Sequence, residues 1–390
     1  MRVCMLTYSH YETDARVRRY AETLVKRGDQ VDVIALGTDS SGDHIMLRGV
    51  NFYSIQTRKP DERERWSYFI RILKFLFKSA IFLTNRHLKR PYQVIHIHNL
   101  PDFLVFASVF PKLLGAKIIL DIHDILPECY STKFNADRTG FAFRLLTLIE
   151  KVSMVFSNHV IVSNHIWQKT LVSRSVKEKK CTVILNYPDE SIFYKRPRNR
   201  KDDKFIMIYP GSFIWHQGID IAIKAFSIIK DQVPASEFHI YGNGPAQGML
   251  ETLVFDLGLQ NRIIFRKVVP PNELADITAE ADLGIEPKRN YGFANEALST
   301  KIMEFMAVGV PVIASDTKVH RYYFNESVIK FFRAGDENDL AESMLLMIRD
   351  TDLRKRLVSN AWKFVEGYMW MNNKDKYLKL VDSLNGSTRI

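Results

Sequence analysis

Two glutamates in the second half of the chain have a spacing that could bind a sugar and a phosphate together. Glu296 and Glu304 lie eight positions apart in "NEALSTKIMEFMAVGVPVIASD", residues 295–316. The segment predicts a loop, then a helix capped by Ser299 or Thr300, then the strand "PVIAS". Carboxylates in such a place can accept hydrogen bonds from sugar or ribose hydroxyls. The backbone N–H groups of the same helix start can hold an anion.

The segments along the chain indicate an α/β fold. Apolar runs such as "RVCMLTY", "DQVDVIAL" and "AKIILDIHD" alternate with amphipathic stretches such as "DARVRRYAETLVKRG". This order predicts parallel sheets with helices on both faces. The alternation stops in the polar, proline-punctuated "PDESIFYKRPRNRKDDK", residues 188–204, and then restarts. We therefore expect two Rossmann-like, doubly wound domains in tandem with an interdomain cleft.

The expected boundaries follow from this interruption. The first domain is predicted for residues 1–190, a linker for 191–204 and the second domain for 205–370. Residues 371–390 are expected to form a C-terminal helix that packs back on the first domain. Ligands bind such sheets outside the carboxyl ends of the strands, so both glutamates are expected to face the cleft.

The composition is that of a folded protein with more than one core. The 390 residues are 46% hydrophobic and 25% charged. Cys4, Cys129 and Cys181 have neither metal-ligand nor disulfide spacing, which fits a reducing cytoplasm. The start "MRVCMLTYSH" predicts a first strand rather than a signal peptide. The sequence contains no run of 18 apolar residues, so no membrane-spanning helix is expected.

Charge is unevenly distributed between the two halves. Residues 1–200 hold 32 Lys or Arg and 19 Asp or Glu, a net charge of +13, whereas residues 201–390 hold 23 and 25, a net charge of −2. A basic half attracts nucleic acid, anionic lipid or phosphorylated substrates. No RNA-binding, zinc-finger or helix-turn-helix motif is present, so no nucleic-acid partner is expected. No G-x-G-x-x-G follows the first strand, so a dinucleotide-binding oxidoreductase is not expected either.

A basic amphipathic stretch lies in the first half of the chain. Residues 58–90 contain 10 basic and 3 acidic residues, and apolar side chains recur at helical spacing between positions 66 and 81. The pattern is typical of an interfacial helix on an anionic membrane, with a core helix bearing a solvated basic face as the alternative. We expect a peripheral position at the inner face of the cell membrane. The predicted membrane contacts are Trp66, Phe69, Arg71, Lys74 and Lys78.

Several segments resemble segments of one enzyme family and follow one another in the same order as in that family. "NEALSTKIMEFMAVGVPVIASD" resembles the E-x7-E signature of retaining glycosyltransferases of family four, which have the GT-B fold. "YPGSFIWHQGIDIAIKAF" is similar to the strand, glycine turn and helix of their donor domain. "HIHNLPDFL" and "DIHDILPE" are similar to acceptor-domain elements. The opening "DARVRRYAETLVKRGDQVDVIAL" resembles a bacterial branch that builds surface polysaccharides such as capsule, exopolysaccharide or O-antigen.

The resemblance implies roles for individual residues. The substrate would be a UDP- or GDP-sugar, with no cofactor. Glu304 would hold the ribose hydroxyls, Glu296 would contact the donor sugar, and His123 would approach the reacting sugar. Arg16 and His98 are the candidates for acceptor contacts. The other implied donor contacts are Gly211, Ser212, Ala297, Leu298 and Ser299.

The chain departs from the family where the donor diphosphate would bind. The family commonly places an Arg just after the glycine turn and a Lys five residues later. Here Ser212 follows Gly211, and Gln217 precedes Gly218. Leaving-group stabilisation is a large part of such chemistry, so another cation is expected to replace them. The candidates are Lys301, which we favour, then Lys288, Arg289 and His216.

The implied reaction is sugar transfer with retention of configuration to a lipid-linked or oligosaccharide acceptor. The leaving phosphate can take the acceptor proton, so the protein contributes positioning and electrostatics. Neither "KDDK" nor "DILPE" supplies an Asp-x-Asp metal motif, so a metal-independent reaction is expected. The alternatives are a GT-B epimerase, a transferase with a soluble acceptor, and a catalytically idle relative that acts as a partner subunit.

Overall fold

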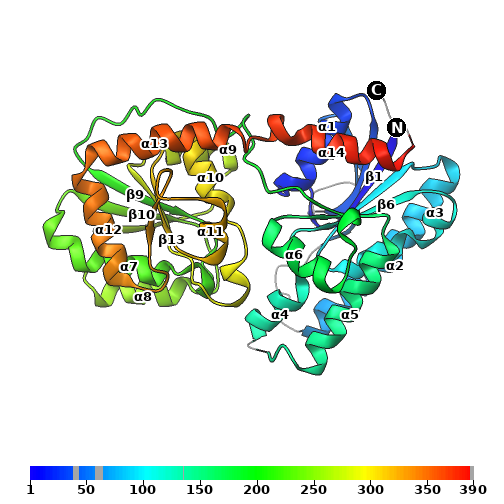
Figure 1. Ribbon diagram of the computed structural model, residues 1–390, viewed down its shortest axis with the longest axis horizontal. Coiled ribbons are helices and arrows are strands. Elements are labelled where there is room, and N and C mark those ends of the chain that lie inside the picture. Colours follow the sequence, from blue (N-terminus) through cyan, green and yellow to red (C-terminus); the bar gives the residue numbers. More distant parts are fainter. Residues whose placement is uncertain (38–43, 58–64, 135, 387–390) are drawn as a thin grey trace. The chain divides into compact units, whose positions relative to one another are not determined.

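The computed structural model of the protein describes residues 1–37, 44–57, 65–134 and 136–386, without the side chains of Arg65 and Trp66. The chain divides into two compact units (Figure 1). One unit contains Met1–Asn186 together with Lys374 onward, and the other contains Tyr187–Asn373. The segment predicted as a returning helix corresponds to α14, which from Lys374 on belongs to the N-terminal unit.

The N-terminal unit is built on a sheet of order β3-β4-β2-β1-β5-β6-β7-β8, parallel except for the antiparallel β3–β4 pair. The chain turns from one side of β1 to the other at β5, which makes β1/β5 the switch point of the sheet. Its strands are β1 (Arg2–His10), β2 (Gln30–Gly37), β3 (His44–Leu47), β4 (Val50–Thr57), β5 (Val94–His98), β6 (Lys117–Ile122), β7 (His159–Val162) and β8 (Cys181–Val183). Its helices are α1 (Ala15–Lys26), α2 (Arg65–Lys89), α3 (Val109–Leu113), α4 (Leu126–Phe134), α5 (Phe141–Phe156), α6 (His165–Arg174) and α14 (Trp370–Leu384), with the 3₁₀ helix η1 (Asp102–Ser108) between β5 and α3.

The C-terminal unit is built on a parallel sheet of order β11-β10-β9-β12-β13-β14, with its switch point at β9/β12. Its strands are β9 (Phe205–Pro210), β10 (Ser236–Tyr241), β11 (Ile263–Arg266), β12 (Leu283–Glu286), β13 (Val312–Ser315) and β14 (Lys330–Phe332). Its helices are α7 (Ile219–Ile229), α8 (Gln247–Asp256), α9 (Pro271–Ala279), α10 (Thr300–Val308), α11 (Lys318–Tyr323), α12 (Glu337–Arg349) and α13 (Thr351–Glu366). Both sheets are doubly wound, as the alternation of the sequence predicts.

Alternating side chains of the central strand β9 serve two separate cores. Met207 and Tyr209 belong to the apolar cluster on one face of the sheet, with Phe226 of α7. Ile208 belongs to the cluster on the other face, with Phe305 of α10. Successive side chains of a strand point to opposite faces, so a strand covered on both sides must be apolar at every position. This explains the continuous run "FIMIY".

Candidate functional site

A pocket of about 310 Å³ opens where three strands of the C-terminal sheet end. The loops after β9, β10 and β11 supply most of its lining, and the helices α9 and α10 supply the rest. This is the carboxyl edge beside the switch point, where ligands of doubly wound sheets bind. The structure brings the predicted residues Gly211, Ser212, Lys301 and Glu304 together here. The lining residues are Pro210, Gly211, Ser212, Tyr241, Gly242, Asn243, Val268, Val269, Leu274, Lys301 and Glu304.

Because two of its residues are glycines, the floor of this pocket is formed by backbone atoms. A Cβ on Gly242 would lie 1.9 Å from the carbonyl oxygen of Gly211. A Cβ on Gly211 would lie 2.9 Å from the Tyr209 hydroxyl and 3.2 Å from Lys301 Nζ. Both residues also have positive φ, 152° and 156°. The two loops can therefore touch, and a ligand can approach the main chain, only while both positions remain glycine.

Lys301 supplies a largely buried positive charge at this pocket, with 14% of its side chain exposed. Its Nζ lies 2.7 Å from Glu286 Oε2, donates to Gln217 Oε1 at 3.2 Å, and lies 4.2 Å from the centre of the Tyr209 ring. Burial alone would lower the pKa of Lys301, but the Glu286 carboxylate raises it well above the ordinary lysine value. Lys301 therefore stays charged throughout the neutral pH range.

Glu286, the partner of Lys301, is a residue that the sequence reasoning missed. It is fully buried at the last position of β12. Burial alone would raise the pKa of Glu286, but the charges of Lys301 and Lys288 lower it below the ordinary value. The carboxylate is therefore ionised and holds Lys301 in place. The available signal was an acidic residue closing the apolar strand "LGIE".

The other proposed replacements for the missing charges have different partners. Lys288 is buried and donates from Nζ to the carbonyl oxygen of Ala297 at 2.7 Å. Arg289 pairs with Asp220 at 2.7 Å and lies over the ring of Trp215. Burial lowers the pKa of His216 to about 4, so this imidazole is neutral at pH 7. Among the four candidates, Lys301 is the one that lines the pocket.

Glu296 is not among the residues that line the pocket. It directly follows the 3₁₀ helix η5 (Gly292–Asn295). Its Oε1 lies 2.7 Å from Lys318 Nζ, at the start of α11. Both side chains are partly exposed, 24% for Glu296 and 57% for Lys318, so this is a surface ion pair of small strength. A ligand hydroxyl could displace it at little cost.

In the loop between the two glutamates, Ala297 is not available for the ligand contact that the resemblance implies. The amide of Ala297 donates to the carbonyl oxygen of Phe293 at 3.0 Å, so it is already used within the fold. The side chain of Leu298 packs against the apolar cluster under α10. Ser299 is the N-cap residue of α10, but its hydroxyl makes no capping bond. This buried Oγ has no hydrogen-bond partner among the described residues.

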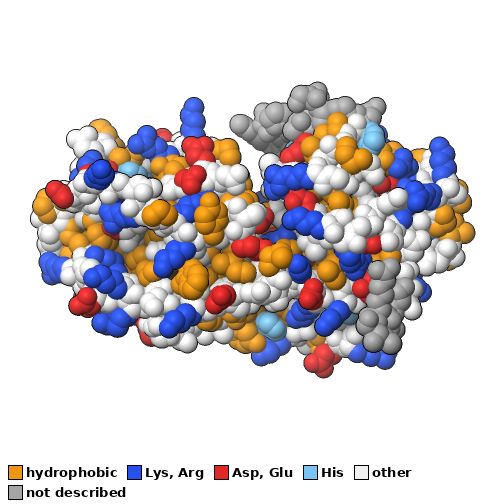
Figure 2. All heavy atoms as spheres, turned by 90° about the horizontal axis from the view of Figure 1, so that it is seen from above, with side chains coloured by type: hydrophobic (Ala, Val, Ile, Leu, Met, Phe, Trp, Pro, Cys, Tyr) orange, Lys and Arg blue, Asp and Glu red, His pale blue; other side chains and the backbone are white. Residues whose placement is uncertain are grey.

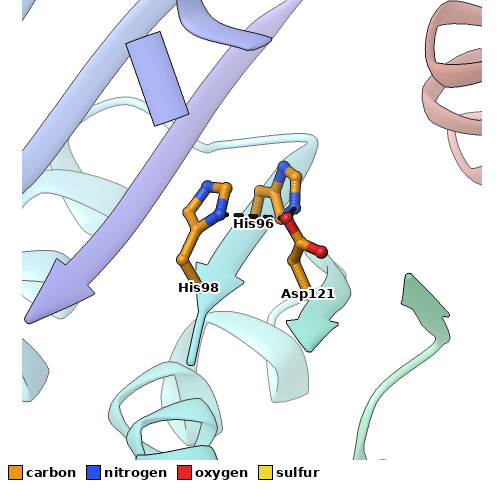
Figure 3. A group of neighbouring side chains, drawn as sticks. All are labelled: His96, His98 and Asp121. Atoms are coloured by element: carbon orange, nitrogen blue, oxygen red, sulfur yellow. Dashed lines mark ion pairs between the residues drawn. The ribbon is translucent and has the colours of Figure 1, made fainter. Parts of the chain in front are cut away.

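A second polar cluster lies at the carboxyl ends of β5 and β6 in the N-terminal unit. Its centre is Asp121, which is fully buried. Arg16 donates from Nε and Nη2 to the two carboxylate oxygens, each at 2.8 Å. His98 Nδ1 and His123 Nε2 each lie 3.2 Å from Asp121 Oδ2, and His96 Nε2 lies 3.7 Å from it. Figure 3 shows His96, His98 and Asp121, with dashed lines for the contacts between the histidines and the carboxylate.

The electrostatics of this cluster give Asp121 a fixed negative charge. Burial alone would raise the pKa of Asp121, but Arg16 and His123 lower it well below the ordinary value. Burial lowers the pKa of His96 and of His98, so both imidazoles are neutral at pH 7. His96, His98 and Asp121 have metal-ligating atoms within 4.8 Å of one another. Arg16 already occupies both carboxylate oxygens, so the arrangement favours a hydrogen-bonded network over a cation site.

Only part of this cluster can reach a ligand. Arg16 is 5% exposed and also donates to Asn186 Oδ1 at 2.7 Å. This burial argues against the predicted acceptor contact of Arg16 and gives the residue a structural role. His98 is likewise fully buried. The side chain of His123 is 20% exposed, so within the cluster it is the one placed to meet a ligand.

The backbone of His123 is held on both sides. Asn99 Oδ1 accepts from the His123 amide at 2.7 Å, and the Ser163 hydroxyl donates to the His123 carbonyl at 2.8 Å. Asp121 contacts the imidazole ring of His123. Asn99, Ser163 and Asp121, which come from separate segments, therefore fix the position of this histidine. None of these three was predicted from the sequence.

The helix predicted to meet a membrane has a narrow buried face. Ile72, Phe75, Ser79 and Leu83 of α2 are buried against the domain. The predicted contacts Phe69, Lys74 and Lys78 are exposed, Arg71 is half-buried, and the side chain of Trp66 lies outside the described residues. Across the described part of the chain, no helix has an apolar stretch long enough to cross a bilayer. The exposed apolar side chains of α2 are Tyr68, Phe69, Ile70, Phe77, Ile81 and Leu88.

Comparisons with known proteins agree with this architecture. The family model "Glycosyl transferase 4-like domain" matches residues 13–186, and "Glycosyl transferases group 1" matches residues 191–364. An uncharacterized glycosyltransferase of Methanocaldococcus jannaschii is 24% identical, over 90% of this chain and 89% of that protein. The gpi3 subunit of phosphatidylinositol N-acetylglucosaminyltransferase from Schizosaccharomyces pombe is 21% identical, over 95% and 77%.

Solved structures share the fold over nearly the whole chain. Sucrose-phosphate synthase from Thermosynechococcus elongatus has a TM-score of 0.80 at 19% identity, with both chains fully covered. Anabaena HepE in complex with UDP-glucose has a TM-score of 0.74 at 15% identity, over 98% of this chain and all of that one. The two matched models and the shared GT-B fold identify the chain as a glycosyltransferase of the family-four type.

Proposed function

We propose that this protein is a retaining transferase that moves a sugar from a nucleoside diphosphate sugar to a saccharide acceptor. The observation that carries the proposal is the pocket at the carboxyl ends of β9, β10 and β11. It combines a glycine floor at Gly211 and Gly242, a largely buried cation at Lys301 and a carboxylate at Glu304. A pyrophosphate needs the first two features, and a ribose diol needs the third.

The lining suggests how the nucleotide is oriented. Glu304 accepts hydrogen bonds from the ribose hydroxyls, and the apolar side chains of Val268, Val269 and Leu274 cover one face of the base. The diphosphate lies over the glycine floor beside Lys301. Glu296 then contacts hydroxyls of the transferred sugar by exchanging its surface ion pair with Lys318. HepE was solved with UDP-glucose, which favours a UDP-sugar here, with a GDP-sugar as the alternative.

The chemistry of the pocket is electrostatic. As the glycosidic bond to the diphosphate breaks, negative charge grows on the leaving phosphate. Lys301 is already charged and already held by Glu286 and Gln217, so it stabilises that charge without reorganisation. The acceptor hydroxyl adds from the same face of the sugar and gives its proton to the leaving phosphate. Because Lys301 supplies the counter-charge, we propose that transfer does not require a divalent metal.

The acceptor side belongs to the N-terminal unit. We propose His123, oriented by Asp121, as the contact with the reacting sugar. The exposed apolar stripe and the lysines of α2 favour a lipid-linked acceptor at the inner face of the cell membrane. The phosphatidylinositol relative also acts on a lipid, which supports this choice of acceptor class. The product would then enter surface-polysaccharide synthesis.

The test is the melting temperature of the purified protein with UDP-, GDP-, ADP- and CMP-sugars. A ligand that binds the folded state raises this temperature by mass action. One nucleotide class should raise it by several degrees, equally with magnesium and with EDTA. Glu304→Ala should abolish the shift, whereas Glu342→Ala, an exposed glutamate on α12, should retain it.

Two other results would count against the proposal. A shift that requires magnesium would overturn the metal-independent mechanism while leaving the donor site in place. No shift with any nucleotide sugar would favour the reading that this chain is a catalytically idle partner subunit.

A further inference from the structure

We infer that the surface that meets the membrane is formed by three helices, α2, α3 and α5, and that its partner is an anionic lipid bilayer. The inference rests on the proposed membrane contact of α2 and extends it to two helices for which nothing in the sequence pattern indicated a partner. The evidence is the exposure of apolar side chains, their distribution over neighbouring helices and the sign of the charges beside them.

Exposed apolar side chains are concentrated on these helices. In the part of the chain that the structure describes, 28 large apolar side chains are exposed, and 14 of them lie on α2, on α5, or on α3 with the residue that follows it. Soluble proteins seldom expose apolar patches of more than a few hundred Å² unless the patch contacts a partner or a membrane. On α3 and just after it they are Phe110, Leu113 and Leu114, and on α5 they are Phe141, Leu145, Leu148, Val152 and Val155.

The spacing on α5 shows a continuous stripe. Its exposed apolar positions recur at intervals of four, three, four and three residues, which is one face of a helix. The opposite face of α5 is fixed in the domain, since Ser153 and Met154 are fully buried. The ordinary arrangement buries the apolar face of a surface helix. On α5, apolar residues occupy the outer face as well.

The three helices form one layer. The 3₁₀ helix η1 contacts α2, α3 and α5, and α2 also contacts α3 directly. Figure 1 shows α2, α3 and α5 gathered on the side of the N-terminal sheet away from α1 and α14. The residues of η1 are mostly buried between them. The outer rows of α2, α3 and α5 therefore belong to one surface.

The charges on this surface select an anionic partner. The sequences of α2, α3 and α5 contain one acidic residue, Glu150, which is 1% exposed and paired with Arg174. Lys74, Lys78, Arg144 and Lys151 are exposed on the same helices. By contrast, basic and acidic side chains are interspersed over the face of the molecule in Figure 2. An apolar surface whose own helices expose basic but no acidic side chains, among the described residues, complements the acyl boundary and phosphate groups of an anionic bilayer.

The experiment compares sedimentation of the full chain with phosphatidylcholine vesicles and with vesicles containing about 30% phosphatidylglycerol. The wild type should bind the anionic vesicles at low salt. The α5 variant Leu148→Glu/Val152→Glu should weaken binding about tenfold, as should the α2 variant Phe77→Glu/Ile81→Glu. Met46→Glu changes a side chain of the same unit that is 62% exposed on β3, outside this surface, and should leave binding unchanged.

The outcomes separate the two claims. If only the α2 variant loses binding, the three-helix surface is wrong and membrane contact through α2 alone stands. If the wild type ignores anionic vesicles, both are wrong. If the wild type is a dimer that the α5 variant makes monomeric, and vesicles are ignored, the surface contacts a second copy instead. The melting-temperature shift with the nucleotide sugar, which should persist in both variants, shows that the fold and donor pocket are intact and tests the transferase proposal separately.

Discussion

At the scale of single residues, both polar sites are buried charges held by opposite charges. Lys301 is held by Glu286 in the C-terminal unit, and Asp121 is held by Arg16 in the N-terminal unit. A buried ion pair contributes little net stability, but removing one partner leaves the other charge uncompensated. A single substitution at such a site therefore confounds function with folding, and a paired substitution is needed to separate them.

The first prediction concerns Lys301. The double variant Lys301→Met/Glu286→Gln removes the cation without leaving a buried carboxylate alone. It should keep a melting temperature near that of the wild type but lose about 10²–10³-fold in kcat, since leaving-group stabilisation is lost. Lys224→Met, an exposed lysine on α7, should retain activity. Unchanged turnover in the double variant would show that another group carries the diphosphate charge.

The second prediction concerns Asp121 and Arg16. Asp121→Ala should lower the free energy of unfolding by about 3–5 kcal/mol, because Arg16 is left buried without its partner. Arg16→Met/Asp121→Leu should recover most of that stability yet leave transferase activity low, since His123 loses the group that orients it. Urea unfolding and steady-state kinetics measure the two effects. Full activity in the stable double variant would remove Asp121 from any role in positioning His123.

At the scale of elements, the sequence is most informative where its information is local. The runs "FIMIY" and "LGIE" predict strands buried on both faces, and the order of the runs predicts doubly wound sheets, which the structure confirms. Most of what could not be predicted depends on contacts between distant parts of the chain. Arg16 meets Asp121 across 105 residues, and no local pattern indicates that pairing. The Ala297 amide is taken by a carbonyl four residues earlier, which depends on the geometry of one turn.

The third prediction concerns Gly242, in the turn after β10. Gly242→Ala should destabilise the protein and abolish the nucleotide-dependent shift, because its Cβ would overlap the Gly211 carbonyl oxygen at 1.9 Å. The matched control is Gly248→Ala in α8, where an added Cβ meets nothing within 4 Å. That variant should be neutral or more stable by about 0.5–1 kcal/mol, since alanine favours a helix over glycine. Equal melting temperatures for the two variants would show that the loops can separate without cost.

At the scale of the whole molecule, the two units differ in net charge, and they also differ in the ligand proposed for each. The net charge of +13 in residues 1–200 accompanies the helices that expose apolar and basic side chains together. The net charge of −2 in residues 201–390 accompanies a pocket lined by one cationic side chain, the largely buried Lys301. Attraction to an anionic surface therefore acts mainly on the N-terminal unit, and it should weaken with salt, because exposed charges are screened.

The dependence of stability on pH should also arise in the N-terminal unit. Asp102, at the start of η1, is 1% exposed, and burial raises the pKa of its carboxyl to about 7. Nearby Glu150 raises it further, whereas the hydrogen bond from Asn99 and the charge of Arg174 oppose the rise. Between about pH 4 and pH 7 the folded protein therefore keeps a proton that the unfolded chain has released. By linkage, the free energy of unfolding falls as pH rises through this window, and the loss is complete above about pH 7.

Asp102→Asn removes this titratable group. The free energy of unfolding of the variant, relative to that of the wild type, should therefore increase as pH rises. Near pH 3 the wild-type carboxyl is largely protonated in both states, and the two proteins should be similarly stable. At pH 7.5 the variant should be more stable, on the order of 2–4 kcal/mol. Urea unfolding at several pH values measures the difference, in which the contributions of all other groups cancel. Asp256→Asn, an exposed position at the end of α8, should follow the wild-type curve. If Asp102→Asn follows that curve as well, then Asp102 is ionised in the folded protein, and its charge must be balanced by the neighbouring Arg174.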